Sequence, residues 1–287
     1  MQKVLVTGAT GQLGSKLMKL FRETPFQVHG TYNETKPDLE GNYHKMDLTL
    51  EDEISQTISK LQPDVIVHCG AMTNVDACEE NPGLADLINH RATRIIVGLA
   101  RESNCRLYYV STDFIFDGEE GNYCEESTEK PIQTYGKTKL DGERAVLKMH
   151  EDRFCIIRTS VVFGSEKGNF VSWIIESLES GEGISIVENQ WVTPTYSVDL
   201  AEKILQLIVE NRTGVWNISC SDKLSRLEMA YIISNTFGLG IYGIKAVKMD
   251  EMRWSAKRPV NSSLNTKKIG MIARTYTFEE CLIRMKD

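Results

Sequence analysis

Short apolar runs alternate along the chain with stretches in which apolar residues recur every three or four positions. The runs at residues 3–7, 64–68, 106–110 and 154–158 predict buried strands. The stretches between them, such as residues 83–101, predict helices that pack by one face. Because strands that alternate with helices form parallel sheets covered on both sides, the pattern predicts an α/β fold with a doubly wound parallel sheet.

The later part of the chain continues this alternation less regularly. Residues 198–209 and 224–237 predict helices, and Ser225 and Glu228 are spaced for a capping box at the start of the second. No repeat, low-complexity segment or flexible linker separates one region from another. We therefore predict a doubly wound domain of residues 1–163 and 192–220 and a smaller, discontinuous α+β substrate-binding lobe of residues 164–191 and 221–287.

A glycine-rich turn stands between the first predicted strand and the first predicted helix. Residues 7–14 read Thr-Gly-Ala-Thr-Gly-Gln-Leu-Gly. Glycines let a backbone turn sharply and approach a pyrophosphate, while the helix that follows presents free N–H groups to the anion. The spacing is Gly-x-x-Gly-x-x-Gly, and its flanks favour a Rossmann-type dinucleotide-binding turn over a plain glycine turn.

Three polar segments each follow a predicted strand: residues 8–14, 71–73 and 111–113. In parallel sheets, ligands bind beyond the carboxyl ends of the strands. We therefore expect these three segments to meet in one crevice.

Tyr135 and Lys139 are four residues apart in a stretch that predicts a helix, so their side chains share a face. A free tyrosine has a pKa of about 10, and a nearby ammonium favours the phenolate. A hydroxyl from Thr112 could hold a substrate carbonyl against the phenol. This pattern indicates a tyrosine that exchanges protons, although an ordinary surface tyrosine and lysine would give the same motif.

A second copy of the Tyr-x-x-x-Lys motif serves as an internal control. It comprises Tyr32 and Lys36, but Pro37 disfavours helical backbone angles at Lys36. We predict that this second copy is a strand end followed by a loop.

Composition excludes several classes of protein. With 287 residues, of which 41% are hydrophobic, the chain can bury a large core in one or two lobes. A net charge of −7 opposes nucleic acid as a partner. No apolar run is long enough for a membrane span or a signal sequence, so we expect a cytoplasmic protein. Seven cysteines without a Cys-x-x-Cys pair indicate reduced thiols, and the five histidines lack the spacing of a zinc site.

Together, residues 7–14, 111–118 and 135–143 resemble an extended short-chain dehydrogenase/reductase, and more narrowly the dTDP-4-dehydrorhamnose reductases. Further similar motifs cover nearly the whole chain and lie at residues 158–160, 168–171, 189–190, 194–195 and 258–264.

The resemblance implies an enzyme that uses NAD(P)H to reduce the C4 keto group of a nucleotide-activated 4-keto-6-deoxysugar, in deoxysugar or surface polysaccharide biosynthesis. It implies that Tyr135 protonates the sugar C4 oxygen, that Lys139 also binds the nicotinamide ribose, and that Thr112 and Asp113 contact the substrate. The implied cofactor contacts are Gly8, Thr10, Gly11, Gln12, Leu13, Gly14, Asp47, Leu48, Ala71, Met72 and Thr73. The implied substrate contacts include Val161, Asn169 and Arg258, the last at the diphosphate, and a homodimer is a further expectation.

Departures from that family refine the prediction. Val161 stands where the family often has Trp, so we expect the deoxysugar to differ from that of the family. Phe114 stands in place of the Glu that related 4,6-dehydratases use for elimination. Lys16 stands where some members have a metal-ligating Glu, so we expect no metal. The second strand ends at residue 32 without an Asp, and Lys36 could attract a 2′-phosphate; NADPH is therefore favoured, with NADH possible.

Two alternatives stay open. Regulatory subunits of methionine adenosyltransferase resemble these reductases and bind the dinucleotide without being enzymes, and a nucleotide-sugar epimerase would hold NAD and return the hydride to its own substrate. The presence of Thr112, Tyr135 and Lys139 does not separate these readings.

Overall fold

A computed structural model describes residues 1–37 and 41–286. Its centre is a seven-stranded, wholly parallel sheet in the order β11-β6-β5-β4-β1-β2-β3. The strands are β1 Lys3–Thr7, β2 Gln27–Tyr32, β3 Asn42–Lys45, β4 Val65–His68, β5 Arg106–Thr112, β6 Phe154–Thr159 and β11 Gly214–Asn217. The strand order reverses between β1 and β4, which places a ligand crevice at their carboxyl ends. The predicted Rossmann-type fold is confirmed.

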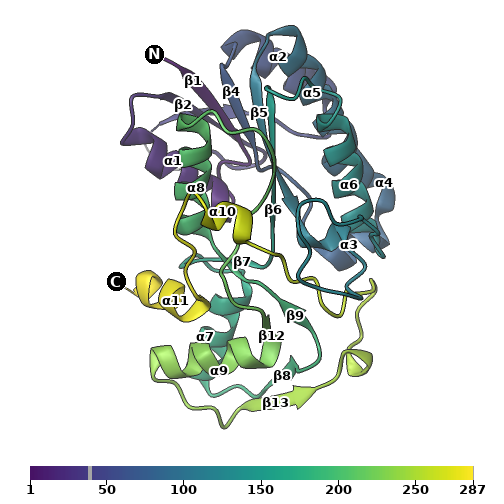
Figure 1. The fold of residues 1–287 in the computed structure, drawn as a ribbon, viewed down its shortest axis with the longest axis vertical. Helices are drawn as coiled ribbons and strands as arrows, with labels where there is room; N and C mark the ends of the chain where they lie inside the picture. Colours follow the sequence, from purple (N-terminus) through teal and green to yellow (C-terminus); the bar gives the residue numbers. More distant parts are fainter. Residues whose placement is uncertain (38–40, 287) are drawn as a thin grey trace.

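Helices cover both faces of this sheet (Figure 1). One face carries α1 (Gln12–Arg22), α8 (Ser197–Val209) and α10 (Lys267–Gly270), and the other carries α2 (Glu51–Leu61), α5 (Ala92–Glu102) and α6 (Thr134–Val146). Because side chains alternate along a strand, Val4 and Val6 pack in the core under α1 and α8, while Leu5 packs in the core under α2 and α5.

The long helix predicted between β4 and β5 is present but contains a π-helical turn. Its parts are α4 (Pro82–Asp86), the turn η1 (Leu87–Arg91) and α5, and the short helix α3 (Val75–Glu80) precedes them. Asn89 is buried in this turn, and its amide donates to Met72 O at 3.0 Å and to Thr138 Oγ1 at 3.2 Å. The turn therefore anchors the loop after β4 to α6.

A smaller lobe contains α7 (Phe170–Ser180), α9 (Arg226–Phe237), α11 (Phe278–Lys286) and the 3₁₀ turn η3 (Met249–Glu251). Its short strands pair β8 (Ile184–Val187) with β13 (Ile244–Val247) and β9 (Trp191–Val192) with β12 (Leu224–Ser225), while β7 (Val162–Phe163) pairs with β10 (Thr195–Tyr196). The predicted capping box of Ser225 and Glu228 is confirmed at the start of α9. The exact lobe boundaries at residues 163, 192 and 220 stay a prediction.

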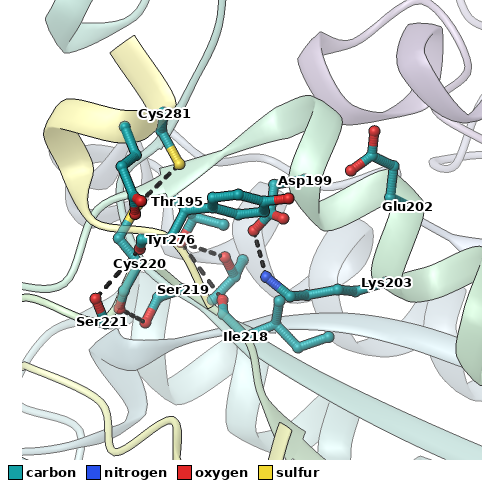
Figure 2. A network of polar contacts seen from close by, with 12 residues as sticks. Thr195, Asp199, Glu202, Lys203, Ile218, Ser219, Cys220, Ser221, Tyr276 and Cys281 are labelled. Carbon is teal, nitrogen blue, oxygen red and sulfur yellow. Dashed lines mark hydrogen bonds and ion pairs between the residues drawn. The ribbon is translucent and has the colours of Figure 1, made fainter. Parts of the chain in front are cut away.

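Residues 267–286 return across both parts of the molecule. Ile269 packs in the core under α1 and α8, and Phe278 packs in the core of the small lobe. Figure 2 shows the surroundings of this segment: Cys220 Sγ lies 3.6 Å from Cys281 Sγ, and Asp199 and Lys203 form a buried ion pair within α8. Lys203 Nζ lies 5.9 Å from the Tyr276 ring centroid. The segment therefore joins the sheet to the small lobe.

The structure can be compared with the predictions for the second Tyr-x-x-x-Lys motif and for the cysteines. Tyr32 is the last residue of β2, and Lys36 lies in the loop after it, as predicted. All seven cysteines are free thiols. Within residues 1–37 and 41–286, no helix has both the length and the apolar character needed to span a bilayer.

Candidate active site

A cleft of about 1060 Å³ runs from the carboxyl ends of β1, β2, β4 and β5 to the small lobe. It brings together nearly all the residues predicted from the sequence. Those that line it are Gly8, Thr10, Gly11, Gln12, Leu13, Gly14, Asp47, Leu48, Ala71, Thr73, Thr112, Asp113, Tyr135, Lys139, Val161, Asn169 and Arg258. The predicted cofactor contact Met72 is not among the lining residues; its backbone N and O are hydrogen-bonded to the Asn89 side chain at 2.8 and 3.0 Å.

The glycine turn leaves the first turn of α1 open to the cleft. Gly11 is the N-cap residue of α1 and supplies no side-chain cap. A Cβ on Gly14 would lie 2.2 Å from Gly8 O, so only glycine lets α1 pack this closely against the turn. Exposed helix N–H groups behind a tight backbone turn fit a dinucleotide pyrophosphate.

Lys16 faces a carboxylate at the edge of the glycine turn. Its ammonium forms an ion pair with Glu166, which comes from the loop after β7. In that loop, the Asn169 amide donates to Gly164 O at 3.0 Å, and its oxygen caps α7 at Val171 N, also at 3.0 Å. Among the described residues, no three His, Cys, Asp or Glu side chains are grouped so that they could hold a metal ion. Asn169 thus uses its polar atoms within its own loop.

Tyr135 is positioned by the start of α6. The Gln133 side chain caps this helix by accepting from Gly136 N at 2.6 Å and donates to Phe114 O at 3.3 Å. A Cβ on Gly136 would lie only 2.0 Å from Phe114 O, so glycine is what lets the helix meet the 3₁₀ turn η2 (Asp113–Ile115). The Phe114 ring then stands edge-on to Tyr135, with ring centroids 6.1 Å apart.

Burial raises the pKa of Tyr135 above its ordinary value, and the charge of Asp113 adds to that effect, while a hydrogen bond with Thr112 opposes it. The sequence reasoning had a nearby ammonium lowering this pKa, and that direction is wrong for the structure. Lys139 donates from Nζ to Val110 O at 2.7 Å, and its burial lowers its pKa to about 7. These directions favour a protonated phenol at Tyr135 and, one helical turn along α6, an amine at Lys139 that exchanges protons near neutral pH.

Asp113 is buried, and both of its carboxylate oxygens accept hydrogen bonds from protein hydroxyls. Its Oδ2 accepts from Ser160 Oγ at 2.7 Å and from Ser262 Oγ, and its Oδ1 accepts from Thr112 Oγ1 at 3.1 Å. Burial raises the pKa of this carboxyl, and the three hydroxyl donors oppose that shift. Asp113 thus fixes Thr112 in place and ties it to two distant segments.

Val161 adopts a backbone conformation that β-branched residues rarely take. Its φ is +41°, and its side chain lines the cleft. Thr195 holds this turn by donating from Oγ1 to Ser160 O at 2.7 Å and from N to Val161 O at 3.2 Å. Such strain persists only where neighbouring contacts enforce it, and it marks functional sites.

The small-lobe half of the cleft contains residues that sequence reasoning missed. They are Trp173, Arg226, Met252 and Trp254. The predicted Arg258 lies with them, its Nη2 donating to Asp76 Oδ2 at 2.7 Å and its guanidinium 5.1 Å from the Trp254 ring centroid. One signal could have found Arg226: it is the first residue of α9, where the helix dipole disfavours a cation.

The end of β2 contributes Thr31, Tyr32 and Asn33 to the cleft, and none of them is a carboxylate. Lys36, which we expected to attract a 2′-phosphate, is exposed and does not line the cleft.

Comparison with known proteins places this site in a family. The family model described as the RmlD substrate binding domain matches residues 1–285. The dTDP-4-dehydrorhamnose reductase of Aggregatibacter actinomycetemcomitans is 30% identical over 94% of this chain and 92% of its own length. Methionine adenosyltransferase 2 subunit beta of Xenopus laevis is 31% identical over 93% of this chain and 81% of its own length.

A solved structure agrees over the full length. The crystal structure of dTDP-4-dehydrorhamnose reductase from Bacillus anthracis in complex with NADP superposes with a TM-score of 0.90 at 29% identity, covering 100% of this chain and 99% of that chain. The chain described here therefore belongs to the RmlD substrate binding domain family.

Proposed function

We propose that this protein uses NADPH to reduce the C4 ketone of a nucleotide-activated 4-keto-6-deoxysugar. The observation that carries the proposal is the meeting, in one cleft, of an open glycine turn with Tyr135, Lys139 and the Thr112 hydroxyl. Relatives named dTDP-4-dehydrorhamnose reductase support the same reaction class.

Each side chain has a role that follows from its surroundings. Bound NADPH supplies the hydride. Tyr135, whose pKa is raised by burial, stays protonated and donates its proton to the C4 oxygen. Thr112 Oγ1 donates to Asp113 Oδ1 at 3.1 Å in the free protein. When the sugar binds, the Thr112 hydroxyl turns its single proton to the C4 oxygen, and Lys139 reprotonates the phenol. Val161 shapes the sugar subsite.

The preference for NADPH rests on the end of β2. Thr31, Tyr32 and Asn33 contribute no carboxylate that would repel a 2′-phosphate. The solved relative from Bacillus anthracis is a complex with NADP, which supports this choice. NADH binds the same turn in our proposal, but less tightly.

The test is a screen of dTDP-, UDP-, GDP- and CDP-linked 4-keto-6-deoxysugars with NADPH and NADH. Tyr135→Phe should leave NADPH binding largely intact and lower turnover by about 10² to 10⁴, the usual contribution of a general acid. Tyr32→Phe is the matched control, because Tyr32 also lines the cleft but lies at the end of β2. Near-wild-type reduction by Tyr135→Phe would disprove the assignment.

One alternative has a specific observation in its favour. Methionine adenosyltransferase 2 subunit beta is as similar to this chain as the named reductases are. If the wild type binds NADPH but reduces no sugar in the screen, a regulatory role with a protein partner becomes the better proposal. Tightly held NAD with no net reduction would instead indicate an epimerase.

The setting we propose is the cytoplasm, where the seven free thiols stay reduced, and the assembly we propose is a homodimer. Size-exclusion chromatography with light scattering measures that assembly directly.

A further inference from the structure

Arg226 is a half-buried cation with unused hydrogen-bond donors in the small-lobe half of the cleft. Its guanidinium carbon lies 4.9 Å from the Phe170 ring centroid, and its Nε donates to Gln190 Oε1 at 3.4 Å. Among the residues that the structure describes, no carboxylate forms an ion pair with it, and its two Nη groups make no hydrogen bond. Because Arg226 lines the cleft, these free donors belong to a side chain that a ligand in the cleft can reach.

The electrostatic surroundings of Arg226 favour an anion. The negative charge that acts on it is that of Asp113, whose oxygens already accept from three hydroxyls. Arg258 repels it, and burial lowers the pKa of Arg226 to about 10, so it remains charged at neutral pH. The dipole of α9, which begins at Arg226, adds further positive potential.

Arg258 is the second guanidinium of this half of the cleft, and it is built in a similar way. It stacks on Trp254 as Arg226 stacks on Phe170, but it is neutralised in part by Asp76. Two mutually repelling cations, each held by an aromatic ring and facing one cleft, suit an anion with two charged centres. A diphosphate meets this requirement, because each phosphoryl group can accept from one guanidinium fork.

We propose that Arg226 is a substrate-binding residue that holds the diphosphate of the nucleotide-sugar together with Arg258. The proposal rests on the proposed function for its substrate class. In the bound state the diphosphate lies between the two guanidinium groups, removes their repulsion and fixes the distance from the nucleotide to Tyr135. Arg226 therefore selects diphosphate-linked sugars over free ones.

The experiment compares Arg226→Gln and Arg226→Lys with the wild type. Isothermal titration calorimetry measures the Kd of dTDP and UDP, and steady-state assays measure KM and kcat for the best nucleotide sugar. Charge-assisted hydrogen bonds of this kind correspond to roughly 10- to 100-fold in affinity. We expect Arg226→Gln to raise the Kd and the KM by that factor with a smaller change in kcat, and Arg226→Lys to recover part of the loss.

Arg253→Gln is the matched control, because Arg253 is exposed beside the cleft residues Met252 and Trp254 without lining the cleft. It removes the same charge and should leave the Kd of dTDP within about twofold, as expected for an exposed charge. An unchanged Kd of NADPH in Arg226→Gln shows that the glycine-turn half of the cleft remains folded.

The outcomes separate this inference from the proposed function. If the wild type reduces 4-keto sugars while Arg226→Gln keeps the wild-type Kd and KM, the Arg226 inference is wrong and the reductase stands. If the wild type reduces no sugar but binds dTDP through Arg226, the reductase proposal is wrong and the anion site stands. Failure of the wild type to bind any nucleoside diphosphate would overturn the inference.

Discussion

His68 should make the stability of the protein depend on pH. It is the last residue of β4 and is 1% exposed. Its Nδ1 lies 2.6 Å from Thr7 Oγ1, and its Nε2 lies 3.1 Å from Thr93 Oγ1. Thr7 Oγ1 also accepts from Gly70 N at 3.1 Å, so the ring joins the strand ends that carry the cleft.

Burial lowers the pKa of His68 from 6.5 to about 3, and the charge of Lys139 acts in the same direction. A pKa that is lower in the folded state gives stability that is present above pH 6.5 and is lost as the pH falls toward 3. Within that window, each unit by which the pH falls lowers the free energy of unfolding by about 1.4 kcal/mol. We therefore expect His68 to remove about 2 kcal/mol of unfolding free energy by pH 5 and about 4 kcal/mol by pH 3.

The assay is urea unfolding followed by circular dichroism at pH 7 and pH 5, for the wild type and for His68→Gln. The variant loses buried contacts at pH 7, but it should lose about 2 kcal/mol less than the wild type on acidification, because glutamine does not titrate. His150→Gln is the control, since His150 has an exposed side chain. Parallel losses of stability in the wild type and His68→Gln would refute the reasoning.

Two further predictions concern packing. Gly136→Ala places a Cβ 2.0 Å from Phe114 O, so it should lower the free energy of unfolding by about 1 to 3 kcal/mol, measured by thermal unfolding, and should lower turnover. Gly98→Ala, in open space on α5, should raise the free energy of unfolding by about 1 kcal/mol. Equal effects of the two changes would contradict the contact at Gly136. Glu143→Gln weakens the buried pair with Arg158, whose Nη2 lies 2.8 Å from Glu143 Oε2, and should cost about 3 to 5 kcal/mol in urea unfolding. Asp141→Asn breaks only an exposed pair with Arg144 and should lower the free energy of unfolding by less than about 1 kcal/mol. Similar losses in Glu143→Gln and Asp141→Asn would show that the Glu143–Arg158 pair gains nothing from its burial.

The parts of the fold that sequence predicted are those set by local patterns. Apolar runs located β1, β4, β5 and β6, and the topology of parallel sheets then placed the glycine turn and Thr112 at one edge. Pro37 was enough to dismiss the second Tyr-x-x-x-Lys motif, which the structure confirms as a strand end and loop.

The parts that sequence did not predict depend on contacts between distant residues. The Asp113 carboxyl is held by Ser160 and Ser262, which lie 47 and 149 residues further along the chain. The direction of the Tyr135 pKa depends on burial, which neither the Tyr-x-x-x-Lys spacing nor the helix prediction contains. Arg226 was not predicted: the start of a helix is an unusual place for a cation, but nothing local shows that the start of α9 faces the cleft.

Residues 267–286 pack into two separate cores, and the ribosome makes them after the other residues of both cores. During translation, α1 and α8 leave the ribosome long before Ile269, and the small lobe forms its strands before Phe278 arrives. Domains generally fold as units as they emerge, so both parts of this protein wait for the same late segment. Until then their apolar faces stay partly uncovered, and the nascent chain is the form most exposed to chaperones and proteases.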